Sequence, residues 1–121
     1  MSVYRPPTTS AYAPSRVPMQ TIRSRNAIRG HHFFEPGTMR FFRSRAASYG
    51  YLAADGKVYF VTSEQFTGSD GRASPRRYSV CVQNPDGDID TVGEFQAYGS
   101  RSGADAKAFS LAIWGKETPR P

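Results

Sequence analysis

A chain of 121 residues has room for one domain with one modest core, which excludes a multidomain protein. Apolar residues make up only 38% of it, so eight Phe, seven Tyr and one Trp indicate a compact core built on aromatic side chains. The single cysteine, Cys81, excludes an internal disulfide, and no apolar run is long enough for a signal peptide or a membrane span. We therefore expect a cytosolic protein without membrane contact.

The formal charge of +6 is concentrated at the start of the chain. Residues 1–30 carry +5 with no acid, residues 31–48 carry +2, and residues 49–121 carry −1. A basic segment attached to a nearly neutral domain indicates contact with a polyanion or with an acidic partner.

Residues 1–26 are predicted to form a disordered basic arm. They are rich in Pro, Ser, Thr and Arg and have no periodic apolar pattern, so burial cannot offset the entropy of ordering them. Tyr4 and Tyr12 lie among arginines, a composition that suits stacking on bases while Arg contacts phosphate; the alternative is a solvated tail without function. Four prolines argue against a long helix here: Pro6, Pro7, Pro14 and Pro18.

The folded domain is predicted to span residues 27–116, with a flexible tail over 117–121. Pro36 is well placed to open a helix, because its missing N–H costs nothing in the first turn. Met39, Phe42 and Ala46 recur at helical spacing and predict its buried side. On this helix Arg40 and Arg43 share the side opposite the buried one, and Arg45 lies on a flank. These arginines either contact phosphate groups or form a hydrated surface.

Four antiparallel strands are predicted after this helix. Asp55-Gly56 is a strong signal for a tight hairpin between the first two strands. The apolar run 58–61 places the second strand at the centre of the sheet, and Gly93 marks a bulge in the fourth strand. The strands are expected over residues 49–54, 57–65, 78–83 and 89–98, with a loop over 67–77 and a turn over 84–87.

A second helix is predicted over residues 103–114. Ser102 and Asp105 approximate a capping box at its start, and Gly115 is a natural stop. Its buried positions are expected at Ala104, Ala108 and Leu111. The predicted fold is α+β in two layers, with one antiparallel sheet of about four strands and helices packed on one face.

Two motifs that resemble metal sites fail on closer inspection. Asp86, Asp88 and Asp90 have the spacing of the first three ligands of an EF-hand loop, but Thr91 occupies the position of the required glycine and Ala97 that of the bidentate Glu. We interpret this run as a polar hairpin turn. His31 and His32 have no Cys or acid at metal-ligand spacing, so structural zinc is not expected.

No enzymatic centre is predicted, and no cofactor. Cys81 lies in the middle of a predicted strand, without the cation or helix terminus that stabilises a reactive thiolate. A pocket that joined His32, Glu35 and tyrosines would contradict this expectation. Arg72, Arg76 and Arg77 in or after the long loop either extend the basic surface or serve solubility.

Four strings in the sequence resemble a set of small uncharacterised proteins carried by bacteriophages, plasmids and actinobacterial genomes. The resemblance covers about residues 27–112 and implies a small accessory protein of a phage or mobile element, without an established activity. The strings are FFEPGTMRFFRSRA, VYFVTSEQF, RRYSV and DTVGEFQAYGSRS.

A weaker resemblance concerns the order of elements over residues 76–112. This run is similar to the last two strands and final helix of a double-stranded RNA-binding domain, which has an α-β-β-β-α order and reads A-form RNA by shape. That family has a lysine cluster at the start of the final helix, where this chain keeps only Arg101 and Lys107. The resemblance therefore implies a similar architecture and no binding of double-stranded RNA.

The leading hypothesis is a non-enzymatic protein that binds nucleic acid through its arm and first helix, in the host cytoplasm. The rival hypothesis is a protein-interaction module that docks on a host factor, with aromatic anchors such as Phe41 or Tyr98. A virion or oligomeric component is a third possibility, and the sequence does not set the oligomeric state. The candidate phosphate contacts are Arg23, Arg25, Arg29, Arg40, Arg43, Arg45, Arg76 and Arg77.

Overall fold

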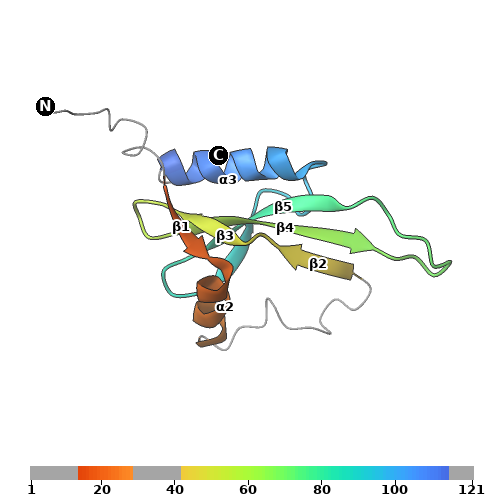
Figure 1. Cartoon of the computed structure of the whole chain (residues 1–121), viewed down its shortest axis with the longest axis horizontal. Coiled ribbons are helices and arrows are strands. Elements are labelled where there is room, and N and C mark those ends of the chain that lie inside the picture. The colour runs from red at the N-terminus through yellow and green to blue at the C-terminus, as the bar shows by residue number, and fades with distance from the viewer. Residues whose placement is uncertain (1–13, 29–41, 115–121) are drawn as a thin grey trace, which may run out of the picture.

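An antiparallel sheet of six strands forms the middle layer of the protein, and one helix lies over each of its faces (Figure 1). The computed structural model describes residues 14–28 and 42–114, with the backbone alone for residues 42–44. Its elements in chain order are β1 (Ser15–Pro18), α2 (Met19–Ile28), β2 (Phe42–Ala46), β3 (Tyr49–Leu52), β4 (Val58–Phe66), β5 (Arg77–Gln83), β6 (Ile89–Val92) and α3 (Arg101–Trp114).

The nine-residue strand β4 organises the sheet. The strands follow the order β1-β3-β4-β5-β6, and β2 also pairs with β4. β5 pairs with β4 along residues 58–64, so β3 and β2 share the other edge of β4, β3 at its start and β2 at its end. Alternate β4 residues point to opposite faces of the sheet, and both faces of its first half are buried.

Helix α3 covers one face of the sheet. It buries a stripe of small and branched side chains that includes Ala104, Ala108 and Leu111, as predicted. This stripe packs against Tyr59 and Val61 of β4 and neighbouring side chains. Small alanines on the buried side let the helix approach the sheet closely, so the aromatic rings fill the remaining space.

Helix α2 covers the opposite face. Met19 and Ile22 pack with Val58, Phe60 and Cys81, all from the centre of the sheet. Ile22, Val58 and Phe60 are almost completely inaccessible to solvent. Burial of this kind contributes roughly 1.5–3 kcal/mol for each large apolar side chain, so Met19 and Ile22 stabilise the docking of α2 on the sheet.

Polar contacts join α2 to the last residue of β5 and to the turn between β5 and β6. The Gln83 side-chain amide donates to the carbonyl of Ile22 at 2.8 Å and to that of Gly87 at 3.2 Å. Asn26 donates to the same Gly87 carbonyl at 3.1 Å. Both side chains are buried, and losing Gln83 would remove a hydrogen bond from two carbonyls, whereas losing Asn26 would leave Gly87 with one donor. This Asn26–Gln83–Gly87 clamp joins residues that are 61 positions apart.

The prediction of a disordered arm over residues 1–26 is wrong from Ser15 onward, since β1 and most of α2 lie there. The domain therefore begins before Ala27, while residues 1–13 lie outside the described residues. Pro18 does not prevent this helix because it directly precedes the first helical residue, and the amide of Met19 donates to the carbonyl of Ser48 at 2.9 Å.

The predicted helix from Pro36 to Ala46 is also wrong where it can be checked, because residues 42–46 form β2. The sheet has six strands instead of about four, and its two helices lie on opposite faces instead of one. The α+β class and the antiparallel sheet are confirmed. The predicted tail over 117–121 lies outside the described residues.

Three strands and the C-terminal helix occur close to their predicted bounds, with local corrections. The predicted fourth strand is shorter, since β6 ends at Val92 and Gly93 follows it with a positive φ of 72° instead of forming a bulge within it. Ser100, not Ser102, caps α3, because its hydroxyl accepts a hydrogen bond from the amide of Gly103 at 3.1 Å. Asp105 instead accepts a hydrogen bond from the hydroxyl of Tyr51.

Candidate anion-binding site

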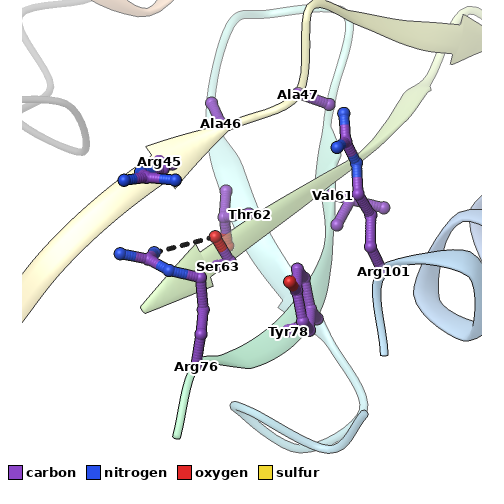
Figure 2. A pocket seen from close by; sticks show the side chains of 9 residues that line it. All are labelled: Arg45, Ala46, Ala47, Val61, Thr62, Ser63, Arg76, Tyr78 and Arg101. Atoms are coloured by element: carbon purple, nitrogen blue, oxygen red, sulfur yellow. Dashed lines mark hydrogen bonds between the residues drawn. The ribbon is translucent and has the colours of Figure 1, made fainter. Parts of the chain in front are cut away.

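A cavity of about 130 Å³ lies on the α3 face of the sheet, at the N-terminal end of α3. Figure 2 shows the guanidinium groups of Arg45 and Arg76 on one side of it and Arg101 on the other, with Ser63 and Tyr78 between them. The remaining lining residues are Ala46, Ala47, Val61 and Thr62.

The register of the sheet brings the polar lining residues together. Ser63 of β4 pairs with Arg45 of β2 on one side and with Tyr78 of β5 on the other. Directly opposed residues of antiparallel strands present their side chains on the same face, so these three form a row across the sheet. Ser63 is two positions from Val61, which packs under α3, and the row therefore continues the α3 face beyond the end of the helix.

Arg101 reaches the cavity because it continues the line of the buried stripe of α3 into the first turn, where its own side chain is exposed. It lies three residues before Ala104 and seven before Ala108, which is the spacing of one helix face. Its side chain is therefore directed toward the sheet, while its position at the first turn leaves it beyond the packed core. Figure 2 places it next to Val61 and Ala47.

Arg76 is held against the sheet by a hydrogen bond. Its Nη1 donates to the hydroxyl oxygen of Ser63 at 2.9 Å, and Ser63 is buried. This contact fixes one guanidinium on the cavity wall, next to the exposed guanidinium of Arg45. A positioned guanidinium loses less conformational freedom when it binds a ligand than a mobile one.

The charge of the cavity is positive, since no Asp or Glu is among the described residues that line it. Within residues 14–28 and 42–114, the side chains of Arg45 and Arg101 form no ion pair. Guanidinium groups present several donors in a planar fork that matches phosphate and carboxylate oxygens. The arrangement therefore suits the binding of an anion.

The acid nearest in sequence, Glu64, points to the other face of the sheet. It is buried, and its carboxylate accepts hydrogen bonds from the hydroxyls of Thr62 at 2.9 Å and Ser79 at 3.4 Å. Burial raises the pKa of Glu64, whereas the two hydroxyls and the charge of Arg76 act in the opposite direction. Glu64 thus lies behind the site without lining it.

We expect Glu64 to make stability depend on pH. Because its pKa is higher in the folded than in the unfolded chain, its contribution is largest at acidic pH and is lost as the pH rises through the raised pKa. Glu64→Gln should flatten the decline of the free energy of unfolding as the pH rises above the ordinary glutamate pKa of about 4.3, measured by urea denaturation. The exposed Glu94→Gln is the control, and equal pH profiles for Glu64→Gln and the wild type would contradict the assignment.

Two of the eight predicted phosphate contacts, Arg45 and Arg76, line the cavity. Arg77 lies elsewhere and donates from Nε and Nη2 to the carbonyl of Gln96 at 3.2 and 3.1 Å, so it supports the loop before α3. The other five predicted contacts do not line the cavity in the described structure. Arg23 and Arg25 are on α2 at the opposite face of the sheet. Arg43 is described by its backbone alone, and Arg29 and Arg40 lie outside the described residues.

Arg101 is the site residue that sequence reasoning missed. The sequence pattern singled out Arg101 only as one of two basic residues kept where double-stranded RNA-binding domains have a lysine cluster. A usable signal was present, because Arg101 extends the predicted stripe of Ala104, Ala108 and Leu111 by one turn. An arginine at the end of a buried stripe points along the face that meets the sheet.

The structure also places the other residues that the sequence suggested as functional, where it describes them. Cys81 is buried in β5, and burial raises the pKa of its thiol to about 12, which disfavours the thiolate. The acidic run forms the turn between β5 and β6, where Asp86 accepts the amide hydrogen of Asp88 at 2.9 Å, so the interpretation as a hairpin turn is confirmed. His31, His32, Glu35 and Phe41 lie outside the described residues.

Comparison with known proteins finds one family, described as a family of unknown function (DUF7447), which matches residues 18–109. The chain belongs to this family. The DUF7447 match begins at Pro18 and so includes α2, in agreement with the packing of this helix on the sheet. No curated protein and no solved structure matches the chain. Neither helix in the described part of the chain is long and apolar enough to cross a membrane.

Proposed function

We propose that this DUF7447 member is a non-enzymatic accessory protein of a phage or mobile element that binds nucleic acid in the host cytoplasm. The observation that carries the proposal is the convergence of Arg45, Arg76 and Arg101 on one cavity that no described acid lines. The surplus of positive charge before residue 49 and the resemblance to phage and plasmid proteins agree with it.

The mechanism follows from the chemistry of phosphate contacts. Guanidinium groups at the cavity neutralise backbone phosphates and release condensed counterions, which gives affinity with little sequence preference. Arg23 and Arg25, exposed on α2 at the opposite face, add to the general positive field without belonging to the cavity. Affinity should therefore fall steeply as salt is added.

Alanine at both Arg45 and Arg101 should weaken binding to a labelled oligonucleotide by about tenfold or more, since each charged hydrogen bond contributes roughly 1.5–3 kcal/mol. The slope of log affinity against log salt should fall by about 0.7–0.9 for each phosphate contact removed. Fluorescence anisotropy over a salt series measures both quantities. Both side chains are exposed, so the fold should persist, which circular dichroism checks.

The matched control removes the same charge elsewhere. Arg72 and Lys107 are exposed and do not line the cavity, so their double alanine variant should keep most of the affinity. Equal losses in the two double variants would mean that net charge and not the cavity governs binding. Binding that does not change between low and high salt would overturn the proposal.

A second function, docking on a host protein, is favoured by exposed apolar side chains in the last turns of α3. Ile113 and Trp114 are exposed, Trp114 to 76%, and Phe109 is partly exposed while its ring contacts Tyr51. Exposed aromatic side chains often anchor protein interfaces. Capture from host lysate with and without nuclease separates the two functions, because only a docked protein stays at stoichiometric amounts after nuclease. A virion or oligomeric component would instead elute as a defined oligomer in size-exclusion chromatography.

A further inference from the structure

The size of the arginine cavity suits a compact anion. A cavity needs roughly 10–15 Å³ to hold one water molecule, so the volume of about 130 Å³ accommodates a phosphate group with a few waters. A phosphate group that belongs to a larger ligand therefore fits this cavity.

The number of cations exceeds what one internal phosphodiester requires. Arg45, Arg76 and Arg101 line one small volume, and Glu64 on the other face of the sheet offsets part of the charge of Arg76 alone. Arg45 and Arg101 remain, whereas a phosphodiester carries a single negative charge. A phosphate monoester carries about −1.5 to −2 at neutral pH and offers three acceptor oxygens. The charge and the oxygen count of a monoester match this cavity more closely.

The donors surround the cavity from separate elements. Arg45 comes from β2, Arg101 from α3, and Arg76 from the residue before β5 with its guanidinium fixed on Ser63. The hydroxyl of Tyr78 faces the same volume (Figure 2). Donors that approach from several sides can contact a tetrahedral group on more than one oxygen, which a flat basic surface cannot do.

From these observations we propose that the cavity binds the terminal phosphate monoester of a nucleic-acid strand, so that the protein prefers phosphorylated strand ends to internal backbone. This inference rests on the proposed function, because it names the part of the nucleic acid that enters the cavity. Arg45 and Arg101 contact the phosphate oxygens, and Arg76, which is fixed on Ser63, places a further guanidinium on the cavity wall.

The test compares single-stranded oligonucleotides of one sequence that carry a 5′-phosphate, a 3′-phosphate or hydroxyl groups at both ends. Dissociation constants are measured by competition against a labelled strand, with inorganic phosphate and a 5′-mononucleotide as further competitors. We expect a phosphorylated end to increase affinity by about tenfold, the effect of one added set of charged hydrogen bonds. The wild-type full chain is used throughout.

Variants connect this preference to the cavity. Arg101→Ala should abolish the preference for a phosphorylated end while weaker binding of the unphosphorylated strand remains. Arg101→Lys keeps the charge but loses the planar fork, so it should restore only part of the preference. Arg72→Ala should leave it intact, because Arg72 does not line the cavity.

The outcomes separate the inference from the function on which it rests. Salt-sensitive binding that ignores the strand ends would overturn the inference and leave the proposed function standing. Inorganic phosphate or the mononucleotide competing as well as the phosphorylated strand would also overturn it, because the ligand would then be a free phosphate compound. No binding of any oligonucleotide would overturn both.

Discussion

Replacing Ile22 by alanine should reduce the free energy of unfolding by about 2–5 kcal/mol, the usual loss for a fully buried isoleucine. Ile22 is 0% exposed and packs with Val58 and Phe60 at the centre of the sheet. Small domains are stable by only about 5–15 kcal/mol, so this loss is a large part of the total. Urea denaturation followed by circular dichroism measures it.

The same helix supplies a matched control. Ile28 lies at the last position of α2 and is 83% exposed, so Ile28→Ala should change the free energy of unfolding by no more than about 0.5 kcal/mol. A large difference between the two variants would establish that α2 docks on the sheet. Equal and small effects would contradict the docking and restore the interpretation of this region as an arm.

Gly50→Ala in β3 should be clearly destabilising, at a cost of about 1–3 kcal/mol in the free energy of unfolding. A Cβ atom at Gly50 would lie 2.7 Å from Cγ1 of Val58 and 2.9 Å from the backbone oxygen of Tyr59. Because β3 lies between β1 and β4 in the sheet, it cannot move away without breaking a ladder on one side. Thermal unfolding should show a clearly lower midpoint.

Gly99→Ala is the control for this substitution. A Cβ atom there would meet only the Nη1 of Arg77 at 3.5 Å, an ordinary contact, and its backbone does not require a positive φ. Its unfolding midpoint should stay close to that of the wild type. If Gly50→Ala were as stable as Gly99→Ala, the close approach of β3 to β4 would be incorrect.

Sequence patterns that extend over only a few residues were enough to predict the strands and the helix of the second half of the chain. Asp55-Gly56 does form the turn of the β3–β4 hairpin, with Gly56 at a φ of 90°. The stripe of alanines and Leu111 does form the buried side of α3. In both cases the deciding contacts repeat with the period of the local structure, so they are visible in the sequence.

The first half of the chain could not be predicted in the same way. Positions 42 and 46 are four apart, and residues at that spacing share a side in a strand as well as in a helix, so the spacing of Phe42 and Ala46 could not exclude β2. Helix α2 has few apolar residues and depends on Gln83 and Gly87, which lie far along the chain. Contacts of that range leave no periodic signal.

The candidate site was predicted in part for a related reason. Arg45 and Arg76 were selected for their charge, and they meet only because β2 and β5 flank the end of β4. Ser63, which neighbours both arginines, has no distinguishing feature in the sequence, because its place at the site follows from the cross-strand register. The charge was therefore visible in the sequence, but the place where the charges converge was not.

The Asn26–Gln83–Gly87 clamp has a consequence for how the chain reaches its native state. The contacts of α2 with Gln83 and with the carbonyl of Gly87 form only after the β5–β6 turn is in place, so we expect this helix to dock late in folding. A fragment that starts at residue 27 would lack the helix and expose the apolar surface of Val58, Phe60 and Cys81 beneath it. Deletions meant to remove only the basic N-terminus should therefore stop before Ser15.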